Sequence, residues 1–209
     1  MFDILIRIDV GKDGEESEMR SFQVLKGVLC FYSGFFNAAL KNDHYKETQN
    51  GHVRLPSEDP QIFELFVTWV HTRRFYDSTL APSTLMPFDM IAGLCIFADA
   101  HNVPLLQNVA CDVMMEKIKA TRTFPSIDDI FYICDNTVDS SPLRQLLSDV
   151  VLAVSGGEFV WPDLQTRDEV EETHEHMTGS TGKWKYSQLK SWVNSCKYHT
   201  HEYGMSCST

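Results

Sequence analysis

Apolar and polar residues alternate at the start of the chain with the two-residue period of a half-buried β-strand. The apolar positions that share one face are Ile4, Ile6, Ile8 and Val10. A polar turn follows, and residues 21–25 again carry strand-forming side chains. Residues 3–25 are therefore predicted to form a β-hairpin whose loop is longer than a tight turn. Residues 52–56 predict a third strand, which Pro56 closes.

From Lys26 onward the apolar spacing changes to three and four residues, which is the period of an α-helix. Ser33 is a good N-cap and Gly34 a poor interior residue, so the pattern predicts two short helices that meet there. Asp59 and Pro60 supply an N-cap and a first-turn proline for a stronger helix. The predicted core face of that helix comprises Phe63, Phe66, Val67 and Val70.

The helical period continues through the second half of the chain. The segments that show it are residues 91–98, 104–119, 126–134 and 141–154. Asn102 is predicted to end the first of these helices before the second begins, and Ser126 is predicted to be the N-cap of the third. Residues 158–209 are rich in acids and lack a sustained apolar period, so we expect a partly disordered tail there. Residues 183–193 are the exception and predict a short helix.

Composition narrows the class of protein. The chain has 209 residues and 43% hydrophobic composition, which favours one domain of roughly 100–150 residues with an appendage. A formal net charge of −11 argues against a nucleic-acid partner, because lysine and arginine must displace the counterions of phosphates. The charged amino terminus does not fit a signal peptide, and no segment has the roughly 18 consecutive apolar residues of a membrane span. We expect a soluble intracellular protein, in cytoplasm or nucleus, that does not bind membranes.

No pattern in the sequence points to catalysis. There is no G-x-S-x-G elbow, and the segment MTGSTGKW lacks the first glycine and the magnesium-binding hydroxyl of a phosphate loop. No pair of carboxylates is tied to a common cleft. Four of the six cysteines, Cys30, Cys95, Cys111 and Cys134, sit within apolar helical patterns, where a thiol behaves as a small buried hydrophobe. We therefore expect a protein that is not an enzyme.

Several ordered segments resemble a BTB/POZ domain, an α+β interaction module in which a small mixed sheet packs on a cluster of helices. The segments are Asp3-Ile4, SFQVLKGVLCFYSGFFNAAL, VRLPSEDPQIFELFVTWVHT and FADAHNVPLLQNVACDVM. The following segment, SIDDIFYICDNTVDSSPLRQLLSDVVLAV, is similar to the extension of fungal BTB proteins. The resemblance implies a BTB/POZ domain at 1–120, a helical extension at 121–156, and an acidic linker with a Cys/His-containing tail at 157–209.

This resemblance also implies how the chain binds protein partners. In adaptor members of the family, a hydrophobic-x-acid motif contacts the cullin scaffold of ubiquitin ligases, and Tyr45 and Glu47 stand at the matching place. Asp3 and Lys26 match the family's charged pocket. An apolar interface patch is expected at Phe31, Tyr32, Tyr45 and Phe75, for a homodimer or for a cullin. The alternative without a binding role is that Tyr45 packs on the end of the helix and Glu47 is a solvated acid.

A different class of function is suggested by the tail. Cys196, His199, His201 and Cys207 are spaced C-x2-H-x-H-x5-C and offer the two thiolates and two imidazoles that tetrahedral zinc accepts. The alternative hypothesis is thus a zinc-stabilised protein with a C-terminal metal site, and no other cofactor is expected. Four protein ligands would close the zinc site to substrate, which disfavours zinc catalysis. The alternative without a metal is an exposed tail with reduced cysteines and titrating histidines.

Overall fold

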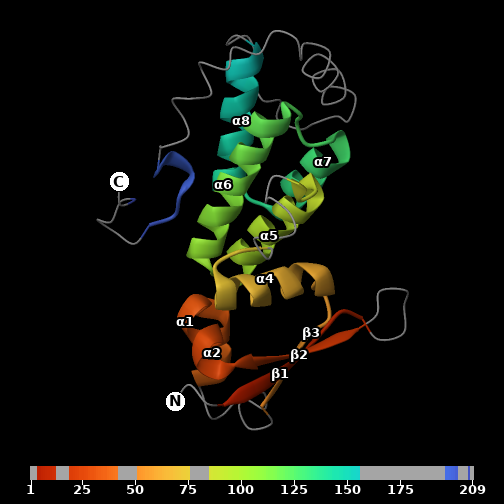
Figure 1. Cartoon of the computed structure of the whole chain (residues 1–209), viewed down its shortest axis with the longest axis vertical. Helices are drawn as coiled ribbons and strands as arrows, with labels where there is room; N and C mark the ends of the chain where they lie inside the picture. The colour runs from red at the N-terminus through yellow and green to blue at the C-terminus, as the bar shows by residue number, and fades with distance from the viewer. Residues whose placement is uncertain are drawn as a thin grey trace. The chain divides into compact units, whose positions relative to one another are not determined.

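The computed structural model describes residues 4–12, 19–41, 51–75, 85–155, 196–201 and 207. Its elements in chain order are β1 (Leu5–Val10), β2 (Arg20–Leu25), α1 (Lys26–Tyr32), α2 (Gly34–Lys41), β3 (His52–Leu55), α4 (Pro60–Thr72), α5 (Phe88–Ala100), α6 (Pro104–Thr121), α7 (Ile127–Asn136), α8 (Pro142–Ser155) and the 3-10 turn η2 (Cys196–Tyr198) (Figure 1). The chain divides into two compact units. Unit 1 comprises Met1–Ala81 and Phe97–Leu106, and unit 2 comprises Pro82–Ile96 and Gln107–Thr209.

A three-stranded mixed sheet lies in unit 1, as the sequence predicts. Its order is β2-β1-β3, with β1 antiparallel to β2 and parallel to β3. Ile8 marks the register, because it stands opposite Phe22 on one side and Val53 on the other. Ile6, Ile8 and Val10 are buried on one face, which confirms the alternation. Ile4 departs from the expected pattern and is 48% exposed, because it precedes the paired residues.

Helix α4 supplies the main apolar layer over the sheet in unit 1 (Figure 1). The predicted cap is confirmed: the Asp59 carboxylate accepts a hydrogen bond of 2.6 Å from the Gln61 backbone N–H. The side chains of this helix that are buried include Ile62, Phe63, Phe66, Trp69 and Val70. Val67, predicted on the core face, is only half-buried. Trp69 is buried instead, because α4 also packs against α1, where the Tyr32 ring lies 5.6 Å from the Trp69 ring.

The break between α1 and α2 has a specific physical cause. The Ser33 hydroxyl accepts a hydrogen bond of 3.1 Å from the Phe36 N–H and donates one of 2.7 Å to the His101 carbonyl. The Gly34 N–H donates to the Asn102 carbonyl at 2.9 Å. A Cβ at Gly34 would lie 2.2 Å from the Asn102 Nδ2 atom. The Ser-Gly pair therefore caps a helix and permits a close backbone approach at once.

A buried carboxylate lies on the opposite face of the sheet. Asp9 is only 6% exposed and accepts hydrogen bonds from Arg7 Nε at 2.9 Å and Ser21 Oγ at 2.6 Å. His52 Nε2 lies 2.7 Å from its second oxygen. Burial by itself would raise the pKa of Asp9, but the hydrogen bonds from Ser21, Arg7 and His52 and the charge of Arg7 outweigh it. The pKa of Asp9 is lowered to about 2.

We expect the stabilisation by Asp9 to depend on pH. A folded-state pKa below the unfolded value stabilises the fold above pH 4 and loses that effect as the pH falls from about 4 to about 2. Asp9→Asn should lower the free energy of unfolding by about 1–2 kcal/mol at pH 7. Urea unfolding at pH 7, 4 and 2.5 measures the difference between the wild type and this variant. A difference that stays the same at all three values would contradict the prediction.

Unit 2 is helical in the part of the chain that the structure describes. Its apolar core includes Ile91, Leu94, Met114, Ile133, Leu146 and Val150. The predicted cap of α7 is confirmed as a capping box, in which the Asp129 N–H donates to Ser126 Oγ at 3.2 Å and the Ser126 N–H donates to Asp129 Oδ2 at 2.8 Å. The buried thiols of Cys95 and Cys111 lie 3.9 Å apart. Cys134 is half-buried.

The α+β class and the small mixed sheet with its helical cluster are thus confirmed. The predicted helix at 183–193, the acidic stretch at 158–182 and the expected partial disorder of the tail lie outside the described residues. Within those residues, no helix is long and apolar enough to cross a membrane.

Candidate functional site

An aromatic cluster in unit 1 combines one exposed ring with two supporting rings and a cation. Phe31 is 73% exposed, and its ring meets the Tyr32 ring edge-on at 4.7 Å. The Arg73 guanidinium lies 3.9 Å from the centre of the Tyr32 ring and 4.6 Å from that of Trp69. Arg73 ends α4 in the left-handed conformation, with φ 62°. We call Phe31, Tyr32, Trp69 and Arg73 the Phe31 surface.

Two histidines and two cysteines come together in unit 2. One ligand atom from each of Cys196, His201 and Cys207 lies within 4.8 Å of the other two. His199 Nδ1 lies 2.9 Å from Cys207 Sγ, and His201 Nε2 lies 3.4 Å from the same sulfur. The Cys207 N–H donates a hydrogen bond of 3.1 Å to Cys196 Sγ. We call these four residues the Cys/His cluster.

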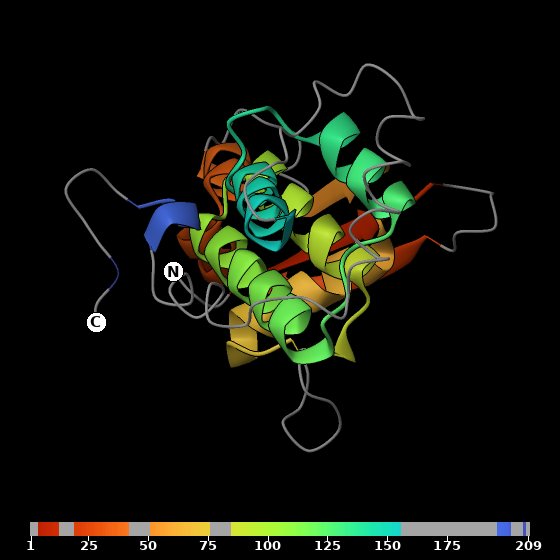
Figure 2. The same ribbon diagram turned by 90° about the horizontal axis from the view of Figure 1, so that it is seen from above.

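Side chains of α6 and α8 hold the segment that carries this cluster. The Asn108 amide pairs with the backbone of Thr200 twice, donating to its carbonyl at 3.0 Å and accepting from its N–H at 2.7 Å. Asp149 accepts from the Tyr198 hydroxyl and from the Lys197 ammonium group. Tyr198 is itself buried. The segment 196–201 therefore lies beside α6 in both views (Figures 1 and 2).

The surroundings of Cys207 favour its neutral thiol. Hydrogen bonding to Cys196, burial, and the negative charges of Cys196 and Asp112 raise the pKa of Cys207 to about 11. In this arrangement the thiol keeps its proton near neutral pH and can donate it to His199 Nδ1. The other nitrogen of that ring, Nε2, lies 2.9 Å from Asp112 Oδ1.

Comparison with known protein families identifies the family of the amino-terminal half of the chain. Residues 6–117 match the BTB/POZ domain family. The chain belongs to this family. A search of curated proteins finds no match to the chain. BTB/POZ domains are protein-interaction modules that also mediate dimerisation, and this is the function that membership supports. The BTB/POZ resemblance read from the sequence is therefore confirmed.

The structure places the predicted interface residues of the BTB/POZ domain in different environments. Phe31 is exposed and Tyr32 half-buried beneath it. Phe75 is 6% exposed and cannot serve as an exposed contact, which corrects the prediction. The chain turns at Arg73, and an apolar ring just beyond that turn gains hydrophobic free energy by joining the core. Tyr45 and Glu47 lie outside the described residues.

Of the two residues that the family resemblance places in a charged pocket, only Lys26 lies within the described residues. Lys26 is half-buried and opens α1, and its N–H donates to the Ile4 carbonyl at 2.8 Å. Asp3 lies outside the described residues. The pairing of these two side chains stays a prediction.

Sequence reasoning missed two functional candidates. Arg73 stands four residues after Trp69, but it is the left-handed C-cap of α4, so helical spacing alone does not predict the stacking of its guanidinium. Asp112 carries no local signal, because it stands 87 residues before the histidine that it contacts. Among the described residues, the structure brings Cys196, His201 and Cys207 together and places His199 against Cys207, but it does not bring the interface residues together as one exposed patch.

Proposed function

We propose that this BTB/POZ protein acts by binding other proteins rather than by catalysis, through self-association, as an adaptor of a cullin-type ubiquitin ligase, or both. The observation that carries the proposal is the Phe31 surface within a domain of an interaction family. A phenylalanine that is 73% exposed leaves most of its apolar area in contact with water. Covering that area with a partner chain recovers hydrophobic free energy.

The support beneath Phe31 favours its use as an anchor. The Tyr32 ring meets the Phe31 ring edge-on, and Tyr32 in turn contacts both Trp69 and Arg73. An aromatic side chain that is ordered before binding loses little entropy when the partner arrives. Tyrosine and arginine are also among the residues that most often carry binding energy in interfaces. The Arg73 guanidinium adds a positive charge beside the Tyr32 ring, and this charge suits a carboxylate on the partner.

The adaptor part of the proposal has separate support. Tyr45 and Glu47 follow α2, which ends at Lys41, and they match the hydrophobic-x-acid motif of family adaptors. An apolar anchor next to a carboxylate can combine burial of the ring with selection of a basic rim on the cullin. The two surfaces can therefore be tested by different variants of the same chain.

The test is the absolute mass in solution, alone and with a purified cullin amino-terminal domain. We expect Phe31→Ala to weaken self-association at least about 30-fold in Kd, because truncating an anchor residue costs about 2 kcal/mol or more. Tyr132→Ala, which removes another exposed ring in unit 2, is the matched control and should leave the mass unchanged. A monomeric wild type at all concentrations would rule out self-association.

The adaptor arm uses the double variant Tyr45→Ala/Glu47→Ala. We expect a complex between the wild type and the cullin domain that this variant weakens, while Tyr132→Ala does not. Absence of a complex with the wild type would overturn the adaptor role and leave a self-associating module. A complex that the double variant does not weaken would move the cullin contact to another surface.

A further inference from the structure

We propose that the Cys/His cluster binds one zinc ion, with Cys196, His199, His201 and Cys207 as ligands and Asp112 as the positioning residue of His199. The spacing of the donor atoms fits tetrahedral zinc. Zinc binds sulfur at about 2.3 Å and nitrogen at about 2.0 Å, so a tetrahedral site places a sulfur and a nitrogen about 3.5 Å apart. His201 Nε2 and Cys207 Sγ are 3.4 Å apart. Cys196 lies within the same 4.8 Å group.

The two nitrogens of His199 suit it as the fourth ligand. Its Nε2 lies 2.9 Å from the Asp112 carboxylate, which can only accept a hydrogen bond, so Nε2 carries the proton. The lone pair then sits on Nδ1, which faces Cys207 Sγ at 2.9 Å, so the ring must move about 0.6 Å from the sulfur to admit the ion between them. A histidine ligand held by a carboxylate through its other nitrogen is a recurring arrangement in metal sites. Asp112 on α6 therefore selects the tautomer that a metal needs.

Charge and hydrogen bonding also suit zinc. Two thiolates and two neutral imidazoles around Zn²⁺ form a site of zero net charge, which can sit in half-buried surroundings at low cost. The Cys207 N–H already donates to Cys196 Sγ at 3.1 Å, and such a bond stabilises the thiolate of a ligating cysteine. Zinc binding would displace the proton of each ligating thiol, because only thiolates bind the metal.

Four protein ligands make this a structural site rather than a catalytic one, because no position remains for water. The ion would close the loop from Cys196 to Cys207 and connect it through His199 to Asp112 on α6. The hydrogen bonds of Asn108 to Thr200 and of Asp149 to Tyr198 hold the same segment on α6 and α8. The proposed role of the metal is to fasten the carboxyl-terminal segment to these two helices.

The first test measures bound metal in the full chain after reduction, exposure to zinc and removal of free ions by gel filtration. We expect one zinc per chain in the wild type and at least a tenfold lower content in Cys196→Ser and Cys207→Ser. Cys134→Ser removes a thiol outside the cluster and should keep its zinc. A wild type without bound zinc, or equal loss in Cys134→Ser, would overturn the proposal.

A second test addresses ligand identity and the role of Asp112. Cobalt-loaded wild type should show the absorption of tetrahedral thiolate-bound cobalt, and this signal should be lost in Cys196→Ser. Asp112→Asn should keep one zinc per chain but release it to a competing chelator about 10- to 100-fold more readily. Asp128→Asn, an acid at the start of α7, is the matched control. Equal zinc affinity in Asp112→Asn and the wild type would remove Asp112 from the site.

Discussion

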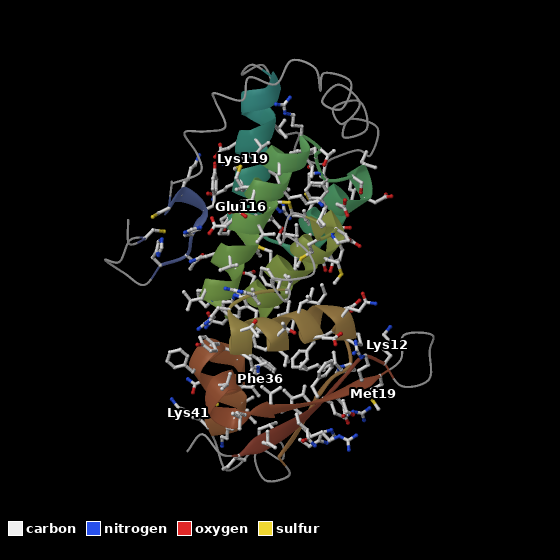
Figure 3. The ribbon with its side chains drawn as sticks, viewed as in Figure 1. Lys12, Met19, Phe36, Lys41, Glu116 and Lys119 are labelled. Atoms are coloured by element: carbon white, nitrogen blue, oxygen red, sulfur yellow. The ribbon has the colours of Figure 1, made fainter. Side chains whose placement is uncertain are left out.

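Replacing Phe36 by alanine is expected to lower the free energy of unfolding by about 3–5 kcal/mol. Phe36 is fully buried in unit 1, where Figure 3 shows it beneath α4. Its ring lies 6.4 Å from those of Phe63 and Phe66 and 6.0 Å from that of His101. Removing it leaves a cavity among rings that come from α4 and from His101, which follows α5. Rings of this size cannot close such a cavity without leaving their rotamers.

Urea unfolding of the wild type and Phe36→Ala measures this effect. Phe31→Ala is the matched control, because the same atoms are removed from a side chain that is already mostly in water. It should change the free energy of unfolding by less than about 1 kcal/mol. Similar losses for the two variants would show that burial of Phe36 is not what stabilises unit 1. The control also establishes that the variant used to test self-association is folded.

Replacing Arg144 by alanine is expected to cost about 2–4 kcal/mol. The Arg144 side chain is 15% exposed and joins the start of α8 to the end of α7. Its guanidinium donates to Thr137 Oγ1 at 2.8 Å, to the Asp139 carboxylate at 2.6 Å, and to the carbonyls of Cys134 and Thr137. Truncation leaves these carbonyls at the helix end without their donor, which costs their desolvation free energy.

Arg144→Lys separates charge from geometry. An ammonium group keeps the charge but cannot reach all four acceptors, whose positions match the planar fork of a guanidinium. We expect a loss intermediate between the wild type and Arg144→Ala, measured by urea unfolding. Gln145→Ala, at the next position on α8, is the control and should cost less than about 1 kcal/mol. A lysine variant as stable as the wild type would show that charge alone stabilises this junction.

The interaction proposal and the zinc proposal can fail separately. The Phe31 surface belongs to unit 1 and the Cys/His cluster to unit 2. If only the cysteine variants behave as expected, and lose zinc, the zinc proposal holds alone. If only Phe31→Ala behaves as expected, and lowers the oligomeric mass in solution, the interaction proposal holds alone. The sequence motifs that led to each are likewise distinct. The first depends on an ordered series of segments within residues 1–120, and the second on the spacing of four residues in the tail.

Features that depend on near neighbours in the chain could be predicted from the sequence. The alternation around Ile6 and Ile8 predicts a strand because side chains alternate between the faces of a sheet. The caps at Asp59 and Ser126 are predictable because the hydrogen bonds that satisfy a helix start reach only two or three residues ahead. The spacing of Cys196 to Cys207 likewise lies within one short segment.

Contacts between distant residues were decided by the tertiary structure alone. Asp9 stands on the polar face of a strand, yet it is buried because Ser21 and His52 come from the two neighbouring strands. The alternation predicts which face a residue occupies, but not what covers that face. Asp112 reads as a solvated acid on α6 until the tail brings His199 to it. The sequence by itself therefore determined the elements, their caps and the family, whereas the packing of those elements determined which polar side chains meet, because such meetings depend on positions that no local pattern records.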